Sequence, residues 1–144
     1  MVIRVLVGIC LACFLSLGSL LLSPSAIALT EIPLIDISYK ECPPELAEGG
    51  VGSGSSDPVS CFLVTGKTKN TTGKIVYDAD VFGWIYDANN EPAMQNRNRV
   101  GSIAEIEPGI HDFEVRISVP ANQPTPLKLE KFKASGFTGK VRKY

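Results

Sequence analysis

The segment from residue 113 to residue 119 alternates strictly between apolar and polar side chains. Phe113, Val115, Ile117 and Val119 take the odd positions, and charged or hydroxyl side chains take the even ones. A period of two places one kind of side chain on each face of a β-strand. No segment after residue 28 has apolar residues at helical spacing. The chain after residue 28 is therefore expected to fold from strands.

Turn-forming residues separate the expected strands. Residues 70–73, 87–90 and 107–109 are rich in Asn, Asp, Gly and Pro, which favour tight turns. The predicted strands cover residues 34–39, 61–69, 76–86, 93–100, 103–106, 113–119 and 127–141. About seven short strands with turns between them predict an all-β fold, an immunoglobulin-like antiparallel β-sandwich.

The first 28 residues have the pattern of a cleavable secretory signal. Arg4 precedes an apolar run over residues 5–22, and Ala26-Ile27-Ala28 has the small side chains that signal peptidase requires. We therefore expect a signal helix that is cleaved near Ala28, and a protein located in the periplasm, in a thylakoid lumen or outside the cell.

Two alternatives for this segment remain open. The apolar run is near the lower length limit for a membrane span, so it could be retained as an anchor. Pro24, two residues after the run, breaks the helix that an anchor would need and favours cleavage. Cys13 offers a lipidation site, but cutting there would leave an apolar segment exposed to water.

The remaining chain divides by composition into two parts. Residues 29–58 contain the first strand and a loop rich in Gly and Ser, and residues 59–144 contain the other strands of the sandwich domain. Glycines in this loop precede a strand, and no phosphate-binding lysine follows them. The loop is therefore interpreted as a flexible connection.

Two cysteines remain after the expected cleavage, Cys42 and Cys61. An exported protein meets an oxidising environment, in which such a pair forms a structural disulfide. Their spacing is not the C-x-x-C pattern of redox-active thiols. We therefore predict a bridge that closes the loop at its base.

The charge balance excludes a strong general attraction to nucleic acid, because the formal net charge is -1. Basic residues are nevertheless concentrated near the end of the chain: Lys128, Lys131, Lys133, Lys140, Arg142 and Lys143. They form either a solvated strand face with a frayed tail or a docking surface for an acidic partner or an anionic membrane.

Four aromatic residues lie close together in the third predicted strand: Tyr77, Phe82, Trp84 and Tyr86. Such a cluster usually fills a sandwich core, as the buried tryptophan of immunoglobulin domains does. If the face that carries Phe82, Trp84 and Tyr86 is exposed, it becomes the best candidate for a protein-binding surface.

The residue types that catalysis or metal binding would need are sparse. His111 is the only histidine, and Asp112 beside it should point to the opposite face of the strand, so a Ser-His-Asp triad is not expected. Zinc would need more His or Cys ligands than the chain offers. A calcium site would have to use Asp78, Asp80, Asp87, Asn89 and Glu91, which turn formation explains equally well. We expect no cofactor, no metal and no catalytic residue.

Several segments resemble the FxLYD domain family. Val64-Thr65-Gly66 with Asn70 fits its V-x-G-x-x-x-N opening, and Ile106-Glu107-Pro108-Gly109 before Phe113-Glu114-Val115 fits its turn and strand. Phe82-Gly83-Trp84-Ile85-Tyr86-Asp87 is similar to the motif that names the family, with F-x-x-I-Y-D in place of F-x-L-Y-D.

The resemblance implies an extracytoplasmic immunoglobulin-like domain, often membrane-associated, without catalytic residues. In it the tyrosine and aspartate of the motif close a hairpin while the aromatics fill the core. The expected function is that of a non-enzymatic binding or assembly module that contacts a protein partner. The alternatives are a membrane-surface module that docks through the basic C-terminal segment, and an enzyme with an atypical site.

Overall fold

The computed structural model describes residues 29–47, 58–94 and 98–140. The expected signal helix with its cleavage site at Ala28, most of the Gly/Ser-rich loop, Arg142 and Lys143 lie outside these residues. Within them, no helix is long and apolar enough to cross a membrane.

The described chain is all-β and antiparallel, as the sequence predicts. It forms one 6-stranded sheet in the order β4-β3-β6-β1-β2-β5. The elements are β1 (Leu29–Glu41), α2 (Pro44–Ala47), β2 (Val59–Asn70), β3 (Val76–Tyr86), β4 (Arg99–Ile106), β5 (Gly109–Pro120) and β6 (Lys128–Phe137).

The number of strands is lower than the sequence suggests. The expected strands 93–100 and 103–106 correspond to the single strand β4, which begins only at Arg99. Before it, an isolated bridge joins Tyr86 to Pro92. The short helix α2 was also not expected, since residues 43–58 were interpreted as irregular loop. It is a single turn without buried side chains.

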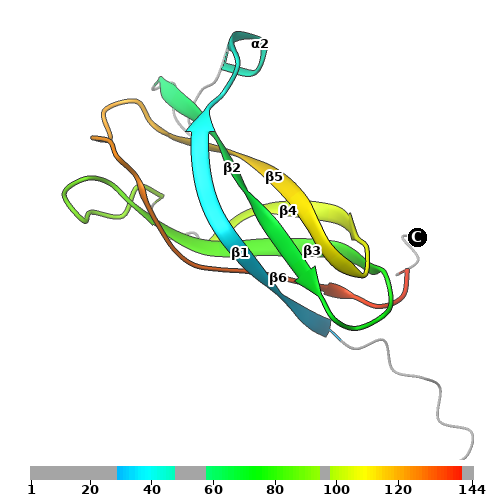
Figure 1. Cartoon of the computed structure of the whole chain (residues 1–144). Coiled ribbons are helices and arrows are strands. Elements are labelled where there is room, and N and C mark those ends of the chain that lie inside the picture. The colour runs from blue at the N-terminus through cyan, green and yellow to red at the C-terminus, as the bar shows by residue number, and fades with distance from the viewer. Residues whose placement is uncertain (1–28, 48–57, 95–97, 141–144) are drawn as a thin grey trace, which may run out of the picture.

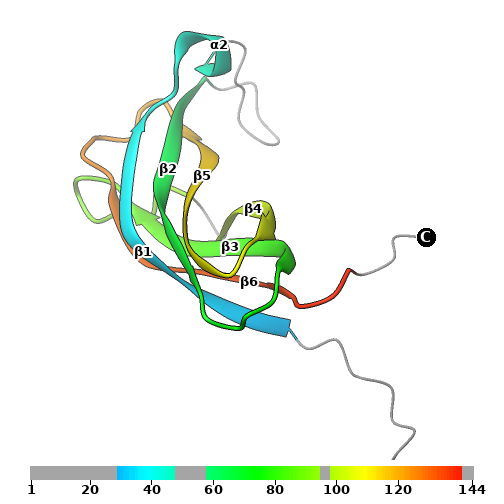
Figure 2. The same cartoon turned by 45° about the vertical axis from the view of Figure 1, so that its right-hand side comes forward.

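The sheet folds over so that its two halves face each other across the core. One half, called here the β3 half, contains β4, β3, β6 and the first part of β1, and the other, the β2 half, contains the rest of β1, β2 and β5. Figures 1 and 2 show that β2 and β5 run across the direction of β3 and β6, with β1 bending from one half into the other. Such corners are typical of crossed β-sandwiches and nearly closed barrels.

A bulge in β1 makes this corner and corrects the expected strand pattern. The register shifts between Ile35 and Ser38, and Asp36 has a positive φ of 54°. Unbroken alternation would place Ile35 on the same face of the strand as Ile37 and Tyr39. Instead Leu34 is buried before the bulge, and Ile37 packs against the core after it. The bulge therefore keeps both parts of β1 directed inward.

Strand β1 lies in the interior of the sheet, between β6 and β2. The sequence assigned residues 29–58 to a segment that precedes the sandwich domain at 59–144. In the structure residues 29–41 are part of the same sheet, because they pair with β6 in the first part of β1 and with β2 in the rest.

The core lies between the two halves and consists of aliphatic residues from every strand with Phe62 and Phe113. Close backbone approach replaces side chains at one point on β6. A Cβ on Gly136 would lie 2.6 Å from the carbonyl oxygen of Tyr77. The glycine lets β6 approach the backbone of β3, its neighbour in the sheet, and β6 ends one residue later at Phe137 instead of continuing to residue 141.

The turn after β2 is built around the buried side chain of Asn70. Its Nδ2 donates to the carbonyl oxygens of Lys74, at 2.8 Å, and Ile106, at 3.0 Å. Its Oδ1 accepts hydrogen bonds from the backbone N–H and the hydroxyl of Thr72. The turn predicted here is confirmed, and Asn70 also joins it to the end of β4.

Candidate functional site

The aromatic residues of β3 lie on the outward side of the β3 half, opposite to the core. Val76, Ala79, Val81 and Ile85 are buried, and they leave the alternate positions facing out. An extra residue at Asp78, with φ 48°, brings Tyr77 onto the outward side as well. The outer aromatic face, as we call it, consists of Tyr77, Phe82, Trp84 and Tyr86.

Exposure distinguishes these four side chains from the core aromatics. Trp84 is 43% exposed, and the other three are half-buried. None of the four belongs to the core cluster or to the partly buried residues packed against it. The expectation that they fill the core is therefore wrong, and the condition set for a protein-binding surface is met.

One sequence signal could have indicated this orientation. Asp80 shares its side of the strand with Phe82 and Trp84, whereas Val81 and Gly83 share the other. Glycine is required at position 83, because the ring of Phe132 occupies the space where a Cβ would lie. A carboxylate on the aromatic side and small or aliphatic residues on the other favour the aromatic side as the outer one.

The strands beside β3 supply a polar surround to the outer aromatic face. In the register of β3 with β6, Trp84 pairs with Glu130 and Tyr86 with Lys128. On the other side, Arg99 of β4 forms an ion pair with Asp80 at 2.6 Å. The hydrogen bond from Arg99 to Asp80, together with the carboxylate charge, raises the pKa of the guanidinium. Aromatic side chains surrounded by polar groups are typical of protein interfaces.

The basic residues near the end of the chain do not form a uniformly free positive surface. Lys133 forms an ion pair with Glu31 of β1 at 2.7 Å. Lys128 donates to the carbonyl oxygen of Ala88 and to the side chain of Asn90.

Lys140 and Lys131 complete the described part of this basic segment. The Nζ atom of Lys140 lies 3.9 Å from a carboxylate oxygen of Glu105 and 5.1 Å from the centre of the Tyr77 ring. Lys131 is exposed. Three of the four lysines described in this basic segment therefore contact oxygen atoms of the protein itself.

The outer surface of the β2 half has a different character. Lys40 and Glu114 form an ion pair at 3.0 Å, and Lys67 and Asp112 form another at 2.7 Å. The hydrogen bond from Lys67, followed by its charge, lowers the pKa of Asp112, and the same contact raises the pKa of Lys67. Charge pairs of this kind are typical of a solvated sheet surface.

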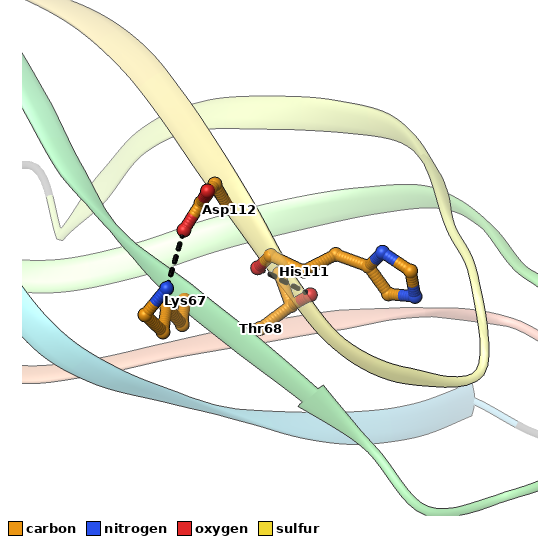
Figure 3. Close-up of polar contacts among 4 residues, drawn as sticks. All are labelled: Lys67, Thr68, His111 and Asp112. Carbon is orange, nitrogen blue, oxygen red and sulfur yellow. Dashed lines mark hydrogen bonds and ion pairs between the residues drawn. The ribbon is translucent and has the colours of Figure 1, made fainter.

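His111 and Asp112 point away from each other, as the strand alternation predicts (Figure 3). The Nε2 atom of His111 lies 2.8 Å from the carbonyl oxygen of Pro108, while Asp112 contacts Lys67. Thr68 uses its hydroxyl to bind the carbonyl oxygen of His111. These contacts leave no arrangement in which Asp112 orients the imidazole.

Two of the acidic residues considered for calcium, Asp87 and Asp80, have side-chain contacts within the protein. The Oδ1 atom of Asp87 accepts hydrogen bonds from the backbone N–H groups of Asn89 and Glu91, which closes the turn after β3. Asp80 pairs with Arg99. The described part of the chain contains no group of three or more residues placed to hold a metal ion.

The predicted disulfide between Cys42 and Cys61 is present, with 5.4 Å between the two Cα atoms. The backbone N–H of Cys42 also donates to the carbonyl oxygen of Cys61 at 3.1 Å. The bridge therefore joins the end of β1 to the start of β2 at the base of the loop.

No protein-family model, curated protein or solved structure matches this chain. The functional interpretation therefore depends on the geometry of the site itself. Its most distinctive feature is the outer aromatic face of β3, since the other outer surface is covered by ion pairs.

Proposed function

We propose that the protein is an exported, non-enzymatic binding or assembly module that docks a protein partner through the outer aromatic face. The observation that carries the proposal is the outward orientation of the β3 aromatics, with Trp84 at 43% exposure. Tryptophan and tyrosine are enriched among the residues that dominate binding energy at protein interfaces. A sheet also presents them on a rigid support, which lowers the entropy lost on binding.

The compartment follows from two lines of support. The pattern of residues 1–28 favours export, and the Cys42–Cys61 disulfide is a bond that persists in an oxidising environment. We therefore place the protein outside the cytoplasm, in the periplasm, a thylakoid lumen or the medium.

We also propose membership of the FxLYD domain family on the motifs given above. The resemblance assigns the aspartate of the motif to hairpin closure, and Asp87 accepts two backbone hydrogen bonds in the turn after β3. The aromatic residues of the motif differ from that expectation, since they are directed outward. Under this proposal the motif has two roles in this chain: Asp87 closes the hairpin, and the aromatic residues form the docking face.

Protein docking is better supported than attachment to a membrane surface through the basic segment. Lys133 and Lys140 are paired with carboxylates, and Lys128 contacts the turn after β3. Paired lysines contribute less to the attraction of anionic lipids. The outer aromatic face, by contrast, has no side chain of the core packed over it.

The test compares capture of a partner by the wild-type protein with capture by Trp84→Ala. The control is Ile110→Ala, because Ile110 is 58% exposed and lies on β5, in the other half. If Trp84 is an interface anchor, its truncation should weaken binding by roughly 30-fold or more. Ile110→Ala should bind as the wild type does.

Fluorescence gives a direct second measurement, because Trp84 is the only tryptophan in the chain. Addition of the captured partner to the purified protein should shift the Trp84 emission to shorter wavelength and protect it from acrylamide quenching. A partner that binds Trp84→Ala and wild type equally, or that leaves the emission unchanged, would contradict docking at this face.

A further inference from the structure

The disulfide has a cationic neighbour on the outer surface of the β2 half. The Nε atom of Arg116 donates to the Sγ atom of Cys61 at 3.2 Å. The strand register explains the contact: Cys61 pairs with Ser118 and Leu63 pairs with Arg116, so Arg116 lies diagonally across from Cys61 on the same side of the sheet. Among the described residues no carboxylate forms an ion pair with Arg116.

The two sulfur atoms of the bridge have different surroundings. Cys61 is part of β2, which is paired with β1 on one side and with β5 on the other. Cys42 follows the last residue of β1 and leads into the single-turn helix α2. Among the described residues, the guanidinium of Arg116 contacts the sulfur of Cys61 and not that of Cys42.

This asymmetry predicts how the bond would break. In thiol–disulfide exchange, the attacking thiolate bonds to one sulfur and the other leaves as a thiolate, and the sulfur that forms the more stable thiolate leaves faster. A neighbouring arginine stabilises a thiolate by charge and hydrogen bonding. The arrangement therefore favours Cys61 as the leaving sulfur and Cys42 as the sulfur that is attacked.

We propose that the Cys42–Cys61 bridge is a thiol-exchange site, at which an external dithiol forms a mixed disulfide with Cys42 while Arg116 holds the Cys61 thiolate. The incoming thiolate forms a bond to the Sγ of Cys42, the Cys42–Cys61 bond breaks, and its electron pair passes to the Sγ of Cys61. The second thiolate of the dithiol then attacks the dithiol sulfur that is bonded to Cys42 and releases the Cys42 thiolate. The dithiol is oxidised to a disulfide, and the protein bridge is reduced to two thiols.

The consequence of exchange is local to the connection between β1 and β2. Reduction removes the covalent link across the base of the loop and leaves the pairing of the strands in place. The site lies in the β2 half, whereas the outer aromatic face lies in the β3 half. The proposal therefore stands independently of partner docking.

The first test locates the mixed disulfide. The oxidised protein is treated with 2-mercaptoethanol, a thiol without a charged group, and free thiols are then blocked with N-ethylmaleimide. Cleavage after Glu45 separates the peptide of Cys42 from that of Cys61 for mass spectrometry. We expect mercaptoethanol on Cys42 and maleimide on Cys61. The reverse placement, an equal distribution, or no adduct under native conditions would overturn the proposal.

The second test measures the rate of reduction by dithiothreitol in variants of one arginine. The disulfide of the Arg116→Gln variant should be reduced at least roughly threefold more slowly than that of the wild type, because the leaving thiolate loses its neighbouring cation. Arg116→Lys should retain part of the rate. Lys69→Gln is the matched control, since it removes an equal charge from an exposed position at the other end of β2 from Cys61 and should leave the rate unchanged. Equal rates for Arg116→Gln and Lys69→Gln would refute the role of Arg116, and the mapping on the wild type decides the site even if a variant fails to fold.

Discussion

Replacement of Asn70 by alanine should destabilise the protein more than its position in a turn suggests. Asn70 is only 2% exposed, and its side chain makes hydrogen bonds with three other residues. It donates to the carbonyl oxygens of Lys74 and Ile106 and accepts from Thr72. Alanine removes all of these bonds while leaving their backbone partners in place.

The expected loss can be estimated from the two kinds of bond. The carbonyl oxygen of Ile106 is buried, and leaving such an acceptor without a donor costs about 1–3 kcal/mol. The bonds to Lys74 and Thr72 are partly exposed, so water can replace them, and together they contribute about 0.5–1.5 kcal/mol. The total of about 1.5–4.5 kcal/mol is a large part of the 5–15 kcal/mol that is typical of a domain.

Urea unfolding at neutral pH with the disulfide intact measures this loss, with the emission of Trp84 as the probe. Asn89→Ala is the control, because Asn89 is an exposed turn residue and only its backbone N–H has a described hydrogen bond. It should change the free energy of unfolding by less than about 0.5 kcal/mol. A loss below about 1 kcal/mol for Asn70→Ala would refute the reasoning that the Asn70 amide satisfies the buried carbonyl oxygen of Ile106.

Three further predictions follow from packing, charge and the covalent link. Gly136→Ala should cost about 1–3 kcal/mol in the same assay, since the new Cβ would lie 2.6 Å from the backbone oxygen of Tyr77; an unchanged midpoint would contradict this. In an NMR titration the pKa of Asp112 should lie below the usual aspartate value and return toward it in Lys67→Gln. Because the folded pKa is lowered, the stability contributed by this pair is present at neutral pH and is lost as the pH falls through the folded pKa; a pKa unaffected by Lys67→Gln would refute the assignment. Reduction of the disulfide should lower the free energy of unfolding by about 3 kcal/mol. Coincident unfolding curves with and without reductant would contradict a stabilisation of this size.

Local patterns in the sequence were sufficient for the positions of most strands and turns. The alternation at residues 113–119 falls within β5, and Gly109 takes a positive φ of 100° where β5 begins after the turn. The single pair Cys42–Cys61 was predicted because only these cysteines follow the expected signal segment. These features depend on neighbours along the chain, which is why a single sequence contains the information for them.

Other features depend on contacts between distant segments. The bulge at Asp36 is needed because β1 pairs with β6 in one half and with β2 in the other, and neither partner can be inferred from residues 29–41 alone. Likewise, only Arg99 and Val100 of the expected strand at 93–100 fall within β4, and where β4 begins depends on its pairing with β3. Tertiary pairing decided both.

Strands joined by tight turns could be predicted from residues 29–144 alone, because a period of two and turn-forming residues act within a few residues of each other. The outward direction of Phe82, Trp84 and Tyr86 could not, because it depends on the packing of the whole sheet. Alternation divides the side chains of a strand into two sets, but which set is buried depends on what packs against each side. In β3 the side that carries Val76, Ala79, Val81 and Ile85 is part of the core cluster, and the aromatic set is left at the surface.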